Sequence, residues 1–157
     1  MFNDKRLRII TGHYGSGKTE FSVNYVIGLA ETGNKTAIVD LDIVNPYFRS
    51  REMEPQLTEK GIRVISSSIK GISGDLPALS PEIFSVLQDT SYEVVLDVGG
   101  DKVGARALGR YHEYFDREPY DMFFVLNANR HQTSTVDGAV SYLRSIEQGS
   151  MQKVTAL

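Results

Sequence analysis

The chain has 157 residues, of which 41% are hydrophobic and 24% charged, and these values predict one globular domain spanning residues 1–157. Its net charge of −3 argues against general affinity for nucleic acids, and the absence of cysteine excludes disulfides, thiolate metal sites and a cysteine nucleophile. No apolar run approaches the ~20 residues of a membrane helix, so we expect a cytoplasmic protein without a membrane partner.

Short apolar runs and amphipathic stretches alternate along the chain. The apolar runs predict strands over residues 7–10, 36–41, 62–66, 93–98 and 122–127. The amphipathic stretches predict helices over 19–31, part of 49–60, from Ser80 onward, over 104–115 and over 133–148, the last closed by Gly149. A polar segment, 67–79, is the longest predicted loop. This alternation predicts an α/β fold with a mainly parallel, doubly wound sheet and helices on both faces.

A further apolar run, 154–157, predicts the start of a sixth strand at the end of the sequence. A sheet edge left there would expose unpaired backbone groups. We therefore expect that the domain lacks a C-terminal part after Leu157, or that another chain covers this edge.

The segment TGHYGSGKTE, between the first predicted strand and the first predicted helix, fits the phosphate-loop pattern GxxxxGK(S/T). Backbone N–H groups of such a loop, together with the dipole of the helix that follows, form a site for phosphate anions. The residues expected to line that site are Gly12, His13, Tyr14, Gly15, Ser16, Gly17, Lys18 and Thr19.

Three of these residue types have a direct chemical reason to be there. Gly15 and Gly17 let the backbone approach phosphate without a Cβ in the way. Lys18 supplies a positive charge for the β and γ phosphates, and the hydroxyl of Thr19 is a ligand for Mg²⁺. The pattern therefore predicts a site for a nucleotide with Mg²⁺.

Carboxylates follow two of the predicted strands, at the sheet edge where the phosphate loop lies. The spacing of two residues places Asp40 and Asp42 on one side of an extended chain, so that one can support Mg²⁺ while the other orients an attacking water. A solvated turn of acidic residues is the alternative.

The fourth predicted strand ends in VVLDVGGD. Apolar residues ending in Asp97 fit a Walker B pattern, whose carboxylate reaches the metal. Gly99 and Gly100 could donate backbone N–H bonds to the γ-phosphate and move when it leaves, as switch segments do.

The order of these motifs, completed by FVLNANRHQTSTVDGA, resembles that of the MinD/ParA-type P-loop ATPases, a SIMIBI-class family with a deviant Walker A loop. The resemblance implies that Lys18 and Asp42 are catalytic and that Asp42 positions water. It implies that Thr19, Asp40 and Asp97 serve Mg²⁺, and that Asn127 ends the fifth strand near the nucleotide. It further implies ATP-dependent dimers that act on a protein partner.

Two features depart from that family. Its members have Lys-Gly where this chain has His13 and Tyr14, and that lysine reaches the phosphates of the other subunit. We expect His13 to contact phosphate in its own subunit, or Tyr14 to cover the nucleotide, so that ATP alone does not drive dimerisation. The loop and the Gly-Gly-Asp sequence are also similar to those of the nickel-insertion GTPases, so ATP is favoured and GTP is not excluded.

Three functions are compatible with these residues. The first is a Mg²⁺-ATP-binding switch that hydrolyses ATP slowly and acts on an unidentified protein partner. The second is a small-molecule kinase in which Asp42 is the base and the segment 67–79 a lid, and the third is a nucleotide sensor without turnover. Arg106 and Arg110 share a predicted helix face after the second switch, where they form either a partner surface or ordinary exposed charge.

Overall fold

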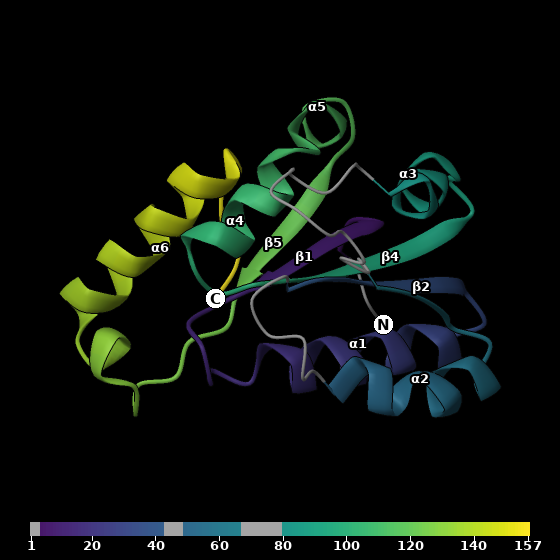
Figure 1. Cartoon of the computed structure of the whole chain (residues 1–157), viewed down its shortest axis with the longest axis horizontal. Coiled ribbons are helices and arrows are strands. Elements are labelled where there is room, and N and C mark those ends of the chain that lie inside the picture. The colour runs from purple at the N-terminus through teal and green to yellow at the C-terminus, as the bar shows by residue number, and fades with distance from the viewer. Residues whose placement is uncertain (1–3, 43–48, 67–79) are drawn as a thin grey trace, which may run out of the picture.

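The computed structural model describes residues 4–42, 49–66 and 80–157. Its centre is a parallel sheet in the order β3-β2-β4-β1-β5 (Figure 1). The strands are β1 (Leu7–Thr11), β2 (Lys35–Leu41), β3 (Arg63–Ser66), β4 (Tyr92–Val98) and β5 (Tyr120–Phe124). The predicted α/β class with a parallel sheet is confirmed.

Helices cover both faces of this sheet (Figure 1). On one face lie α1 (Lys18–Glu31) and α2 (Arg49–Glu59). The other face is covered by α3 (Pro81–Gln88), α4 (Lys102–Gly109), α5 (His112–Phe115) and α6 (Val136–Ser150), and a 3-10 turn, η1 (His131–Thr133), precedes α6. None of the helices in the described ranges has the length and apolar character that crossing a bilayer requires.

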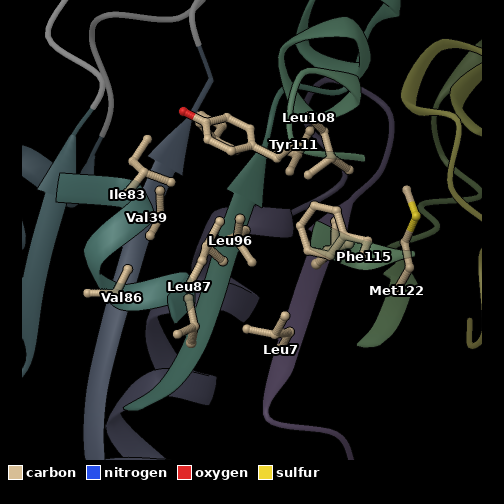
Figure 2. Close-up of a cluster of buried hydrophobic side chains, with 14 of the residues drawn as sticks. Leu7, Val39, Ile83, Val86, Leu87, Leu96, Leu108, Tyr111, Phe115 and Met122 are labelled. Carbon is tan, nitrogen blue, oxygen red and sulfur yellow. The ribbon is translucent and has the colours of Figure 1, made fainter. Parts of the chain in front are cut away.

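The strands are apolar because both of their faces are buried. In β4, Val94, Leu96 and Val98 face the larger core, whereas Val95 faces the smaller core under α1 and α2. Figure 2 shows the larger core, where Ile83 of α3 and Leu108 of α4 pack over the central strands. This double burial fixes the sheet, and with it the position of every strand end.

Three predicted boundaries were wrong for identifiable reasons. The strand predicted over 122–127 begins at Tyr120 and ends at Phe124, and the Val125 N–H makes one more hydrogen bond to β1, at the Thr11 carbonyl oxygen, before Asn127 bonds to the phosphate loop instead. The helix predicted over 104–115 is split into α4 and α5, and the break buries Tyr111 and Phe115 in the larger core. The helix predicted from Thr133 begins at Val136, since Thr133 belongs to η1 and the Thr135 hydroxyl accepts a hydrogen bond from the Gly138 N–H.

Gly149 does not end the last helix, which continues to Ser150 and closes with Met151 in the left-handed region. A Cβ on Gly149 would lie 3.0 Å from the Cβ of Ala105 in α4. The glycine is therefore explained by close packing of two helices, a reason that a single helix pattern does not reveal.

The apolar run at the end of the chain forms one parallel bridge, between Phe123 and Ala156, on the outer side of β5. The Phe124 N–H donates to the Ala156 carbonyl oxygen at 2.9 Å. The sixth strand is thus present as a single bridge. The predicted loop 67–79 lies outside the described residues.

Candidate functional site

The phosphate-loop segment connects β1 to α1 at the carboxyl edge of the sheet. Its chain folds back on itself, with the Ser16 N–H donating to the His13 carbonyl oxygen at 2.9 Å. Gly17 takes a left-handed conformation (φ +92) at the start of α1, and no side chain caps that helix end. The first backbone N–H groups of α1 therefore remain available to donate hydrogen bonds to an anion.

Lys18 and Asp42 form an ion pair at this edge. The Nζ of Lys18 lies 3.3 Å from Oδ2 of Asp42, and both side chains are almost fully buried. Asp42 follows the end of β2, where its backbone N–H donates to Oδ1 of Asp40 at 2.9 Å. The structure thus brings the predicted phosphate lysine and the predicted water-positioning carboxylate into direct contact.

Asp97 lies on β4 beside Asp40 of β2, with which it is in register. It is only 1% exposed, and within the described part of the chain no hydrogen bond of ordinary geometry reaches either carboxylate oxygen, although the Thr19 hydroxyl lies near enough to lower the pKa of Asp97. Burial raises the pKa of this carboxyl from 3.8 to about 7, and although Lys18 and Thr19 oppose the shift, it remains large. A buried, unsatisfied carboxylate of this kind is stabilised by a cation.

These residues fit Mg²⁺. Thr19 supplies a buried hydroxyl next to the buried carboxylate of Asp97, and both are the hard oxygen ligands that Mg²⁺ prefers. The described residues contain no cluster of three His, Asp or Glu side chains that could hold a metal unaided. Mg²⁺ in nucleotide sites does not need one, because phosphate oxygens and water complete its octahedron.

The raised pKa of Asp97 gives a pH dependence of stability whose sign is opposite to that of a salt-bridged aspartate. Between about pH 4 and 7 the folded chain retains a proton that the unfolded chain has released, so the free energy of unfolding falls as pH rises. We expect a loss of up to about 1.4 kcal/mol per pH unit from this group. Urea denaturation across this range should show a shallower decline for Asp97→Asn, and equal slopes would contradict the assignment.

The turn after β4 lies directly against the phosphate loop. A Cβ on Gly100 would come 1.9 Å from the Gly12 carbonyl oxygen, and one on Gly99 would come 3.1 Å from Oδ1 of Asp42. The hydroxyl of Tyr142, on α6, donates to the Gly100 carbonyl oxygen. The predicted switch glycines therefore lie at the site, and the contact of Gly100 with the phosphate loop is one that only glycine allows.

Replacing Gly100 by alanine should separate the two loops. We expect Gly100→Ala to lower the free energy of unfolding by about 1–3 kcal/mol, as overpacking does, and also to weaken nucleotide binding. Gly33→Ala is the control: it strains a positive φ at the far end of α1 but meets no atom within 4 Å. Gly33→Ala should lower the free energy of unfolding by about 1–2 kcal/mol. Its nucleotide affinity, measured by calorimetry, should be unchanged.

His13 and Tyr14 point in different directions. The Nδ1 of His13 lies 2.7 Å from the Tyr14 carbonyl oxygen, and its ring meets the ring of Tyr142 edge-on, with centroids 5.0 Å apart. The Tyr14 side chain is 64% exposed. His13 is therefore held against α6 of its own chain, while Tyr14 faces solvent.

Asn127 lies beyond the end of β5, yet it still reaches the phosphate loop. Its Nδ2 and the Nε of Arg130 both donate to the Gly15 carbonyl oxygen, each at 3.2 Å. A Cβ on Gly15 would come 2.2 Å from Nη2 of Arg130, so this guanidinium covers the loop.

Sequence reasoning missed Arg130 and Tyr142. The signal for Arg130 was its place three residues after Asn127, in a polar loop at the same sheet edge. Tyr142 carries no local signal, because it lies within a helix and reaches the site only through the packing of α6.

The fold is shared with solved P-loop NTPases. FtsY from Mycoplasma mycoides matches with a TM-score of 0.63 and 16% identity over 94% of this chain and 50% of its own. The kinase domain of the Escherichia coli tyrosine kinase ETK matches with a TM-score of 0.59 and 17% identity over 99% and 68%, respectively. FlhF complexed with GMPPNP and Mg²⁺ matches with a TM-score of 0.57 and 13% identity over 100% and 66%.

This likeness shows the fold, and the chain spans between half and about two thirds of these three structures. No protein-family model matches the sequence, and neither does any curated protein.

Proposed function

We propose that this chain binds a Mg²⁺–nucleoside triphosphate, with ATP favoured, and hydrolyses it slowly as a switch of the MinD/ParA type acting on a protein partner. The observation that carries the proposal is the meeting of Lys18, Asp42 and the unsatisfied carboxylate of Asp97 beside the open N-terminus of α1. Buried charges that are costly to the fold alone are the expected signature of a phosphate and cation site.

The proposed reaction is an in-line attack of water on the γ-phosphorus, in which a new P–O bond forms while the bond to the β-phosphate oxygen breaks. Lys18 leaves Asp42 and moves to the β and γ phosphates, and the released Asp42 carboxylate accepts a hydrogen bond from the attacking water. Thr19 and Asp97, with support from Asp40, would hold Mg²⁺, which would supply positive charge to neutralise the phosphate oxygens. The Gly99–Gly100 turn, next to the loop, responds to loss of the γ-phosphate.

Kinase activity is the second candidate, favoured by the fold shared with the kinase domain of ETK. In that case Asp42 would take a proton from an acceptor hydroxyl rather than orient water. A nucleotide sensor without turnover is the third. The nucleotide that the chain binds could carry adenine or guanine, since FlhF was solved with a guanine nucleotide analogue.

One experiment separates these functions. Phosphate release from ATP and from GTP should be measured with Mg²⁺, in parallel with transfer of labelled phosphate to small hydroxyl acceptors and to tyrosine peptides. Release that needs no acceptor supports the switch, and release or transfer only with an acceptor supports a kinase. Tight binding with neither result supports the sensor, and the absence of any nucleotide binding would overturn the whole proposal.

The position of His13 leads to a prediction about assembly. Because its ring packs on Tyr142 of the same chain, we expect the Asp42→Ala protein to remain monomeric in Mg²⁺-ATP. This variant is used because hydrolysis cannot then dissolve a dimer. Light scattering tests the prediction, and an ATP-dependent dimer that His13→Ala prevents would show that histidine replaces the family's intersubunit lysine.

A further inference from the structure

α4 and α6 lie side by side in the helix layer that covers the larger core (Figure 1). A groove of about 610 Å³ lies between them. Its floor is made where the two helices pack through glycines: a Cβ on Gly109 would come 3.2 Å from the Gly149 carbonyl oxygen. We call it the α4–α6 groove. The nucleotide site described above does not include any of its lining residues.

The lining of the groove is basic. Lys102, Arg106, Arg110 and His112 contribute to it, and none of the described lining residues is Asp or Glu. Lys102, Arg106 and Arg110 are exposed and lie four residues apart along one face of the helix and its end. This concentration of positive charge stands out on a chain whose net charge is −3.

The stability of α4 does not explain this arrangement. Cations at the end of a helix interact well with its dipole, which would account for Arg106, but Lys102 is the first residue of α4, where positive charge is unfavourable. The like charges of Lys102 and Arg106, four residues apart on α4, also repel by a few tenths of a kcal/mol. A ligand with negative charge would relieve this repulsion.

We propose that the α4–α6 groove binds an acidic segment of a partner protein. Carboxylates of the segment would pair with Lys102 and Arg106, while its apolar side chains would lie against Met151 and the glycine floor. Nucleic acid fits less well, because the row of positive charges is about the length of one short helix and the chain as a whole carries a net charge of −3.

Both walls of the groove contact the turn that is expected to respond to the γ-phosphate. The α4 wall begins two residues after Gly100, and its Gly104 packs on Gly99, where a Cβ would come 2.4 Å from the Gly99 Cα. The α6 wall is joined to the same turn by the hydrogen bond from Tyr142 to the Gly100 carbonyl oxygen. The groove therefore supplies the partner surface of the switch, a role that rests on the proposed function.

Binding can be tested without nucleotide, by fluorescence anisotropy of a fluorescein-labelled peptide of alternating Glu-Glu-Leu units. We expect it to bind the wild-type chain, and Arg106→Glu to weaken binding about tenfold or more. The matched control is Arg63→Glu, which makes the same charge change at an exposed position of β3, an edge strand remote from the groove. Thermal melts of both variants confirm that they fold.

Four results would overturn the proposal: no binding of the peptide by the wild type, equal weakening by both variants, tighter binding of the corresponding Lys-Lys-Leu peptide, or tighter binding of single-stranded DNA that Arg106→Glu abolishes. None of these measurements uses nucleotide. A result that overturns the groove proposal is therefore distinct from a failure to observe nucleotide binding or phosphate release, which would overturn the proposed function. A change in peptide affinity on adding Mg²⁺-ATP, reduced in Tyr142→Phe, then supports the link to the switch, and an unchanged affinity removes that link.

Discussion

Lys18→Ala is expected to lower the affinity for Mg²⁺-ATP by about 100-fold or more, because it removes a charge-assisted contact to the β and γ phosphates. Lys35→Ala is the matched control. Its ammonium also lies 3.3 Å from a carboxylate, that of Asp89, but this pair is exposed and belongs to the opposite end of the sheet. Calorimetry should find normal nucleotide affinity in the Lys35 variant.

Loss of affinity in Lys18→Ala must be separated from loss of folding. The substitution leaves the buried carboxylate of Asp42 without its lysine, and breaking one side of a buried pair costs about 3–5 kcal/mol. Removing both residues should recover much of that stability but none of the affinity. Tight nucleotide binding by the folded double variant would remove the foundation of the proposed function.

Asp42→Ala is expected to lose most turnover, about 100-fold or more, while affinity for Mg²⁺-ATP stays within a few-fold or becomes tighter. Two separate effects produce this result. The transition state loses the carboxylate that orients water. In the ground state, Lys18 no longer has to break its ion pair with Asp42 before it contacts phosphate. Single-turnover hydrolysis and calorimetry on the same protein measure the two effects.

Asp42→Asn and Asp40→Ala sharpen the test. The asparagine keeps the shape of Asp42 but not its charge, so it should lose turnover like the alanine variant. Asp40→Ala should instead weaken the dependence on Mg²⁺, because Asp40 lies next to the carboxylate proposed to hold the metal. Unchanged hydrolysis in both Asp42 variants would leave that residue without a catalytic role.

The sequence was sufficient to predict the sheet, since strands buried on both faces are continuous apolar runs such as that from Val94 to Leu96. It was also sufficient to predict that Lys18, Asp42 and Asp97 lie at one edge of the sheet, because parallel strands place their carboxyl ends together. The catalytic and metal roles of these residues stay predictions.

What the sequence did not contain was information on packing between distant elements. The Gly149 position resembled a helix end, but Ala105 of another helix explains it. Tyr142 reaches the Gly100 carbonyl oxygen and the ring of His13 only because α6 packs over that edge of the sheet. Such contacts depend on how two helices sit side by side, which no periodicity within either helix determines.

The strand order has a consequence for how the chain is made. β1, which leads into the phosphate loop, pairs with β4 on one side and β5 on the other, so its partners lie more than eighty residues further along the chain. The N-terminal part of a chain leaves the ribosome first, and pairing strands that are so far apart in the sequence requires slow closure of a long loop. We therefore expect β1 to stay unpaired until β4 has emerged and to lack its second neighbour until Phe124 has emerged, so that a shorter nascent chain cannot recognise nucleotide.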